Sequence, residues 1–302
     1  MAIRVRAYQD DDLPRLQRAL ARWIHVAGDC GYYHVGNIAH RIYEGFGGSH
    51  AAAELVQVWE DDAEIIGFAY NFVFEAAFFV FCAPAYRGSP VELEMLRSAY
   101  TTTLDLMQET KQPETTVITD VFACDQLRID LLIQLGFTHY RLWDYITERS
   151  LAGPLPSARL PVGFTMRTAT LDDAVQLAAL RNNAFGANWT GKAYREQVMQ
   201  SPGYNPAREI VVVAPDGRLA AFTIIWLDRR NKVGLFEPVG THSDFRRLGL
   251  ARAMMCHALR QMQELGMERA TVEHLAENEA ARELYHSLGF RKKYETLGYR
   301  LA

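Results

Sequence analysis

Apolar and polar residues alternate regularly in the second half of the chain, and the two periods indicate strands and helices. Four apolar, β-branched runs are typical of strands: residues 209–214, 219–227, 233–241 and 269–274. Three segments repeat apolar residues at helical spacing: residues 172–182, 250–265 and 278–288. Residues 215–218 supply turn chemistry between the first two strands, and Gly266 and Gly289 supply helix stops. This alternation predicts an α/β sandwich of a sheet and helices.

The chain also repeats itself. Residues 123–137 match residues 276–290 at a constant offset of 153. Two further matches, Arg6 with Arg167 at offset 161 and residues 84–87 with 243–246 at offset 159, follow in the same order. A period near 155 residues is too long for a solenoid and indicates a duplicated domain. We therefore expect domains at residues 1–150 and 163–302, joined by a Pro- and Gly-containing linker at 151–162.

Composition fits two globular domains and excludes several classes. Of 302 residues, 49% are hydrophobic and 23% charged, which suffices for two cores, and no apolar run reaches the length of a membrane span. The first half carries 12 Lys and Arg against 21 Asp and Glu, and the second half 20 against 15. The basic second half favours an anionic ligand, but no nucleic-acid-binding motif accompanies it. We expect no nucleic acid, no membrane partner, and a cytoplasmic location.

The cysteines lie far apart in the sequence, without a CxxC pair or a histidine at metal-ligand spacing. The four are Cys30, Cys82, Cys124 and Cys256. We interpret them as reduced core residues, and we expect no metal.

A short motif between the strand at 233–241 and the helix at 250–265 is suited to binding phosphate. It reads Arg246, Arg247, Leu248, Gly249, Leu250, Ala251. A helix N-terminus presents unpaired backbone N–H groups and the positive end of the helix dipole. Gly249 and the small Ala251 allow close approach of a pyrophosphate, while Arg246 and Arg247 add cationic donors. An exposed basic turn with an ordinary turn glycine is the structural alternative.

This hexapeptide resembles the R/Q-x-x-G-x-G/A signature of the GCN5-related N-acetyltransferases, and residues 278–290 are similar to the family's N-x-x-A-x-x-x-Y-x-x-x-G-F segment. The resemblance implies an α/β (α+β) fold class, with two tandem acyl-CoA N-acyltransferase (GNAT) domains, each a mixed central sheet flanked by helices. It also implies acetyl-CoA as cosubstrate, with its pantetheine arm along Val239, Gly240 and Thr241 and its pyrophosphate on residues 246–251. Asn278 would contact the cofactor arm, and Tyr285 would lie near the sulfur.

Acyl transfer from a thioester to an amine needs a neutral amine, a polarised carbonyl and an acid for the thiolate. The resemblance places a backbone N–H near Val239 for the carbonyl and the Tyr285 hydroxyl for the thiolate. Glu237 is our candidate base, with Glu273 and His274 as alternatives. Tyr285 as a core aromatic and Glu237 in a salt bridge are the structural readings of the same residues.

The first half departs from the signature. Pro90 stands where the signature has glycine and lacks a backbone donor, and Glu92 replaces the small residue. Asp125 and Leu132 take the places of Asn278 and Tyr285. We therefore interpret residues 1–150 as a degenerate GNAT-like domain that scaffolds the catalytic one.

The predicted activity is that of an acetyl-CoA-dependent N-acetyltransferase acting on a primary amine of a small molecule or peptide. Asn188, Trp189 and Tyr204, in segments beside the predicted sheet, are candidates to line the acceptor cleft. The alternative is a non-catalytic acyl-CoA-binding sensor or interaction module. The sequence identifies neither the acceptor nor the oligomeric state.

Overall fold

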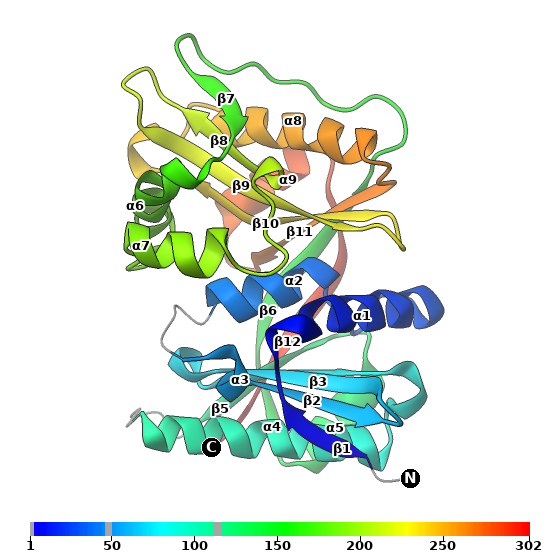
Figure 1. Cartoon of the computed structure of the whole chain (residues 1–302). Coiled ribbons are helices and arrows are strands. Elements are labelled where there is room, and N and C mark those ends of the chain that lie inside the picture. Colours follow the sequence, from blue (N-terminus) through cyan, green and yellow to red (C-terminus); the bar gives the residue numbers. More distant parts are fainter. Residues whose placement is uncertain (1–2, 46–49, 111–115) are drawn as a thin grey trace. The chain divides into compact units, whose positions relative to one another are not determined.

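The computed structural model describes residues 3–45, 50–110 and 116–302, and it divides the chain into two compact units (Figure 1). The first unit comprises Met1–Ile146 and Lys293–Ala302, and the second comprises Thr147–Lys292. Each unit is a mixed, mostly antiparallel sheet flanked by helices, as the sequence predicts. None of the helices in these described ranges has the length and apolar character needed to cross a membrane.

In the first unit the sheet order is β1-β2-β3-β4-β5-β12, followed by β6. The strands are β1 Arg4–Ala7, β2 Val56–Asp61, β3 Glu64–Phe72, β4 Ala77–Cys82, β5 Val117–Phe122, β6 Thr138–Ser150 and β12 Arg291–Leu301. The α-helices are α1 Leu13–Ala27, α2 Val35–Ala39, α3 Ala52–Leu55, α4 Pro90–Glu109 and α5 Gln126–Gln134. Strands β4 and β5 are parallel, whereas β12 runs antiparallel to β5.

In the second unit the order continues from β6 through β11-β10-β9-β8-β7. The strands are β7 Thr165–Thr168, β8 Glu209–Val213, β9 Leu219–Asp228, β10 Val233–Thr241 and β11 Arg269–Leu275. The helices are α6 Ala174–Phe185, α7 Gly191–Tyr194, α8 Leu250–Glu264 and α9 Glu279–Ser287. All four strands and three helices predicted from the periodicity are confirmed, with ends shifted by at most three residues.

The two halves exchange their last strands. Strand β6 leaves the first unit at Ile146, and Thr147 then joins β11, where its Oγ1 donates to the Val272 carbonyl at 2.9 Å. Strand β12 returns to the first unit at Lys293 and pairs with β5. The compact units therefore do not coincide with consecutive sequence halves, because each half supplies the strand that completes the sheet of the other.

Residues 151–164, which contain the predicted linker, have no helix or strand. They are nevertheless packed, because Leu151 is buried and its N–H bonds the Glu268 carbonyl at 2.8 Å. Leu155, Leu160 and Phe164 also lie against the core of the second unit. The segment acts as a strap on that unit rather than as a loose connection.

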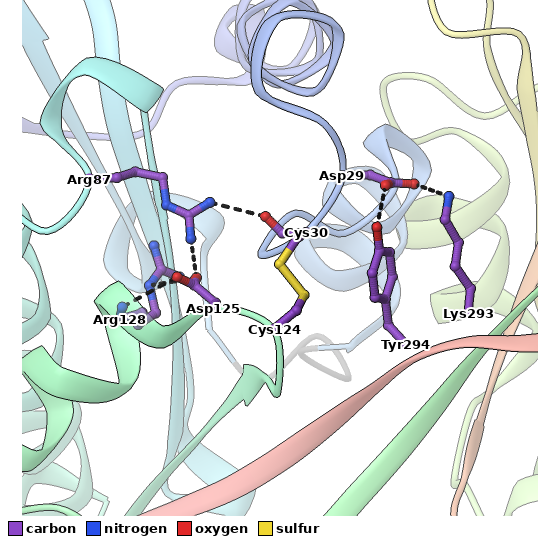
Figure 2. Close-up of a disulfide and its surroundings, with 8 residues drawn as sticks. All are labelled: Asp29, Cys30, Arg87, Cys124, Asp125, Arg128, Lys293 and Tyr294. Atoms are coloured by element: carbon purple, nitrogen blue, oxygen red, sulfur yellow. Dashed lines mark hydrogen bonds and ion pairs between the residues drawn. A yellow bond between two sulfur atoms is a disulfide. The ribbon is translucent and has the colours of Figure 1, made fainter.

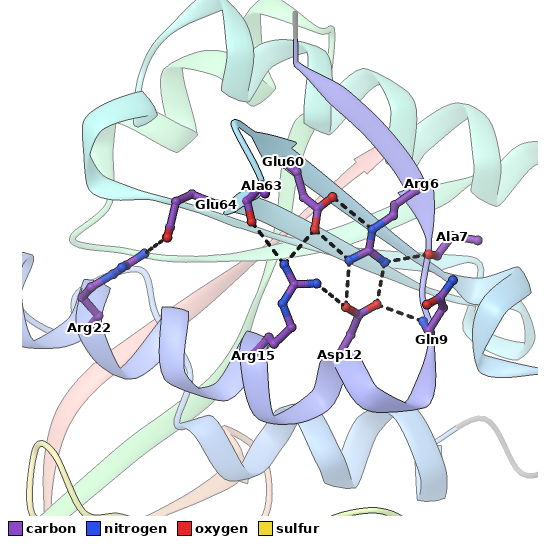
Figure 3. Close-up of polar contacts among 9 residues, drawn as sticks. All are labelled: Arg6, Ala7, Gln9, Asp12, Arg15, Arg22, Glu60, Ala63 and Glu64. Atoms are coloured by element: carbon purple, nitrogen blue, oxygen red, sulfur yellow. Dashed lines mark hydrogen bonds and ion pairs between the residues drawn. The ribbon is translucent and has the colours of Figure 1, made fainter. Parts of the chain in front are cut away.

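The internal repeat has a structural counterpart at each domain start. In the first unit Arg6 forms two bonds of 2.6 and 2.7 Å with the Asp12 carboxylate (Figure 3). In the second unit Arg167 forms two bonds of 2.7 Å with Asp173. Each pair joins the first strand to the start of the first helix. In the first unit the pair extends into a network through Glu60 and Arg15.

The prediction that all four cysteines are reduced is wrong for two of them. Cys30, between α1 and α2, forms a disulfide with Cys124, between β5 and α5 (Figure 2). The two are 94 residues apart, so sequence spacing carries no sign of the pairing. Cys82 and Cys256 are free and buried, as expected.

Candidate active site

The motif that is predicted to bind phosphate, residues 246–251, lies at the junction of β10 and α8. Arg247 and Gly249 both have left-handed backbone conformations, with φ of 64° and 77°. Alternating conformations of this kind turn successive backbone N–H groups toward one side, which suits an anion. Helix α8 starts at Leu250 and has no side-chain cap among the described residues, so its first-turn amides face the motif.

Glycine at 249 is required by its conformation and not by crowding. A Cβ at this position would meet no atom of the chain within 4 Å, so the space beside it is open. A residue other than glycine would be strained at this φ. Arg246, Arg247 and Leu248 are exposed beside it, and Arg246 Nε donates to the Thr241 carbonyl at 3.3 Å.

Strand β10 separates from β11 just before the motif. The two pair in parallel from Val233 with Arg269 to Phe236 with Val272, and no register pair follows. The pairing of β10 with β9 shifts between Phe236 and Val239, around the cis Glu237–Pro238 bond. Val239 and Thr241 therefore lie on a stretch of β10 whose backbone has no strand partner on the β11 side.

Gly240, a predicted cofactor residue on this stretch, has a packing reason to be glycine. A Cβ there would clash with Phe222 Cε1, and no rearrangement of that buried ring relieves the clash cheaply. Packing against Phe222 therefore explains why this residue is glycine. The predicted cofactor contact would use its backbone.

Asn278 caps α9, its Oδ1 accepting from the Ala281 amide at 3.1 Å. Asp125 caps α5 in the same way at its repeat position, accepting from the Arg128 amide at 3.3 Å. Both repeat positions therefore cap the helix that follows them. A contact between Asn278 and a cofactor stays a prediction.

Tyr285 lies on α9 with its ring 5.7 Å from that of His274 and 6.1 Å from that of Phe290. It is 6% exposed, and its hydroxyl forms no hydrogen bond with any residue that the structure describes. Burial raises the pKa of Tyr285 well above its usual value, and the negative charge of Glu237 raises this pKa further. The phenol is therefore protonated at neutral pH.

The three candidate bases differ in their surroundings. The main chain of Glu237 is held through its carbonyl, which accepts from Trp226 Nε1 at 2.8 Å, and its side chain is half-buried. His274 is 7% exposed, and its Nδ1 lies 2.9 Å from the Leu275 carbonyl oxygen, which can only accept a hydrogen bond. Burial lowers the pKa of His274 below 6.5, so its imidazole is neutral at pH 7. Strand alternation puts Glu273 on the face of β11 opposite His274.

Two of the predicted acceptor residues form hydrogen bonds with other residues of the second unit. Trp189 N–H and carbonyl both bond the side-chain amide of Asn182, at 2.7 and 2.8 Å. The Tyr204 hydroxyl donates to Glu209 Oε2 at 2.5 Å, and Tyr194 donates to Oε1 of the same fully buried carboxylate at 2.9 Å. Sequence reasoning missed Glu209 because a glutamate at the start of a strand gives no sign of burial. Asn188 is exposed.

No group of three or more His, Cys, Asp or Glu side chains is placed to hold a metal ion in the described parts of the chain.

Comparisons with known proteins agree with this geometry. The model of the acetyltransferase (GNAT) family matches residues 174–290. A GCN5-related N-acetyltransferase from Sphaerobacter thermophilus superposes with a TM-score of 0.65 at 19% identity, covering 99% of this chain and 95% of that one. No curated protein matches the sequence.

Two further structures share the fold over the full length. A tandem GNAT protein from the clavulanic acid biosynthesis pathway gives a TM-score of 0.65 at 12% identity, covering 99% of this chain and 98% of that one. A GNAT-family acetyltransferase from Colwellia psychrerythraea gives 0.60 at 12% identity, with both chains covered completely. The chain therefore has a tandem GNAT fold, and residues 174–290 of its second half match the GNAT acetyltransferase family.

Proposed function

We propose that this protein transfers an acetyl group from acetyl-CoA to a primary amine of a small molecule or peptide, and that the second unit carries the reaction. The single observation that supports this best is the juxtaposition of the uncapped α8 N-terminus at Gly249 with the unpaired stretch of β10. The N-terminus of α8 suits a diphosphate, and the stretch of β10 suits an extended arm that bears amides. Acyl-CoA has both groups in one molecule.

In this proposal the loop from Arg246 to Ala251 holds the pyrophosphate through backbone N–H groups, with Arg246 and Arg247 adding charge. Val239 and Thr241 bond the pantetheine arm as a further strand would. Gly240 lies between them and keeps the strand packed on Phe222. Asn278 contacts the cofactor arm from the start of α9.

The transfer itself needs two proton movements. The amine nitrogen attacks the thioester carbonyl, the C–N bond forms and the C–S bond breaks. The amine proton passes to a base, for which we propose Glu237, with Glu273 and His274 as alternatives. The departing thiolate takes the Tyr285 proton. The raised pKa of Tyr285 keeps the phenol protonated at neutral pH, so its proton is present when the thiolate departs.

The proposal is tested by incubating the protein with acetyl-CoA and a panel of primary amines while following free thiol release. At least one amine should give thiol in equal amount to acetylated product, and Gly249→Glu should abolish it. Acetyl-CoA binding without transfer to any amine class would favour the non-catalytic sensor instead.

A further inference from the structure

Helix α9 carries Tyr285 in its last turn, and few contacts of the side chain itself fix where its hydroxyl lies. The helix spans nine residues, which is too short to be stable alone. The Tyr285 hydroxyl forms no hydrogen bond with any residue that the structure describes, and its ring lies beside the rings of His274 and Phe290. The place of the hydroxyl therefore depends on what holds the end of α9.

Two arginines from other elements of the second unit hold this end of the helix. Arg252, in the first turn of α8, donates through Nη1 to the carbonyl and hydroxyl oxygens of Ser287, at 3.0 and 2.6 Å. Arg149, near the end of β6, donates through Nη1 to the Leu288 carbonyl. The last carbonyls of a helix have no partner within it, and cations are favourable at this negative end of the helix dipole. We call Arg149 and Arg252 the arginine clamp.

The repeat supplies a counterpart for each residue of the arginine clamp. At offset 159 Arg252 corresponds to Leu93. Arg149 lies against the glycine that follows α9, with its Nη1 3.3 Å from the Cβ position of Gly289. In the first unit Leu301 takes this place, with its Cδ1 3.5 Å from the Cβ position of the matching glycine after α5. Both clamp positions are therefore leucines in the first unit.

Three residues change together between the two copies. Leu93 and Leu301 pack against the core of the first unit, and a leucine side chain cannot donate to a helix carbonyl. The first unit also has Leu132 at the position of Tyr285. A general need to fix the end of this helix would apply to both copies. The arginine clamp occurs in the copy that carries the tyrosine, so its role concerns the tyrosine.

We propose that Arg149 and Arg252 are positioning residues, which hold the Tyr285 hydroxyl where the departing thiolate of the cosubstrate takes its proton. This inference rests on the proposed function, because that function gives Tyr285 the role of acid. Arg252 directly follows the 246–251 motif. One side chain thus joins the turn that is proposed to hold the pyrophosphate to the helix that carries the acid. Both arginines act through α9 and not on the reacting atoms.

The experiment is a double-mutant cycle in the full chain, measured with acetyl-CoA and an amine that the thiol-release assay identifies. Arg252→Leu and Arg149→Leu introduce the residues of the first unit, and each should lower kcat by about 10- to 10²-fold with little change in KM for acetyl-CoA. In Tyr285→Phe the same substitutions should lower kcat by less than about twofold, because no hydroxyl is left to position. Arg252→Lys keeps a donor for the Ser287 carbonyl and should recover part of kcat. Arg260→Leu removes an exposed arginine of the same helix and should equal wild type.

The cycle separates positioning from two other roles of the arginines. A raised KM with unchanged kcat in Arg252→Leu would make Arg252 a phosphate ligand. An equal fall of kcat with and without the Tyr285 hydroxyl would make the arginine clamp a support of the fold. Either result, or unchanged kcat and KM, overturns the inference. Should Arg252→Leu fail to fold, Arg149→Leu and Arg252→Lys decide by the same criteria.

A readout without turnover separates this inference from the proposed function. The protein is labelled with 3-fluorotyrosine, and the fluorine resonance of Tyr285 is identified by its absence from Tyr285→Phe. This resonance should shift in Arg252→Leu and Arg149→Leu, and should stay in place in Arg260→Leu. If wild type acetylates no amine, the proposed function fails, whereas the spectrum still decides whether the arginine clamp positions Tyr285. An unshifted resonance overturns the inference even in an active enzyme.

Discussion

Replacing Gly249 tests the phosphate-binding motif through two changes that separate backbone strain from charge. Gly249→Ala adds a Cβ in open space at φ 77°, so its cost is confined to the left-handed conformation, about 1–2 kcal/mol of folding free energy. Gly249→Glu adds the same strain and a carboxylate at the N-terminus of α8. The alanine variant should lower the melting temperature slightly and bind acetyl-CoA nearly as well as wild type.

The glutamate variant should lose acetyl-CoA affinity. A unit charge about 5 Å from a phosphate charge costs about 3 kcal/mol at an effective dielectric constant of ~20. This corresponds to a loss in affinity of about 10²-fold, measured by calorimetry. Gly266→Glu is the matched control, because Gly266 follows the other end of α8, has φ 83°, and also has no atom within 4 Å of its Cβ position. Equal affinities for Gly249→Glu and Gly266→Glu, both folded, would refute the phosphate assignment.

Three further predictions address catalysis and stability. Tyr285→Phe should lower kcat by roughly 10²–10⁴-fold with little change in KM for acetyl-CoA, and turnover above about a third of wild type would make it a packing residue. Removing the disulfide by Cys30→Ser and Cys124→Ser should cost about 4–5 kcal/mol of unfolding free energy, since the bridge spans 94 residues, and an unchanged urea midpoint would contradict this. Burial raises the pKa of Asp12, but Arg6 lowers it below 3.8 overall, so its stabilisation holds above about pH 4 and is lost as pH falls further. The free energy of unfolding, measured by urea titration, should therefore fall less below pH 4 in Asp12→Asn than in wild type.

The strands, helices and motif of the second half follow from the sequence because their signals are local. The apolar run at β10, the helical spacing in α8 and the Asn278 cap each depend on neighbours within a few residues. The fold of the first half follows from the repeat. Arg6 and Arg167 show this most directly, since the same pair of contacts recurs at both domain starts.

Features that depend on distant parts of the chain were not predicted. The Cys30–Cys124 bridge joins two loops that only the fold brings together. The exchange of β6 and β12 leaves no trace in periodicity, because a strand reads the same whichever sheet it completes. The hydrogen bond of the Tyr204 hydroxyl depends on the burial of Glu209, which tertiary packing decides.

The buried ion pair of Arg128 with Glu92 in the first unit could have been predicted from the sequence. The alignment of the halves pairs Glu92 with Ala251 and Arg128 with Ala281, a joint change from two small residues to opposite charges. Sequence reasoning identified only Glu92 of this pair as a departure from the repeat, because Arg128 lies in a segment whose neighbours match the second half well. Opposite charges that appear together where the other copy of a repeat has two small residues indicate an ion pair.

We propose that acetyl-CoA binds to the second unit alone, and calorimetric titration of the wild-type chain tests this binding most directly. The Gly249 motif is open, whereas its counterpart is closed by Pro90 and the Arg128–Glu92 pair. We expect one acetyl-CoA to bind per wild-type chain, and none to bind to Gly249→Glu at the same concentrations. Two sites per chain, or one site that survives in folded Gly249→Glu, would contradict it.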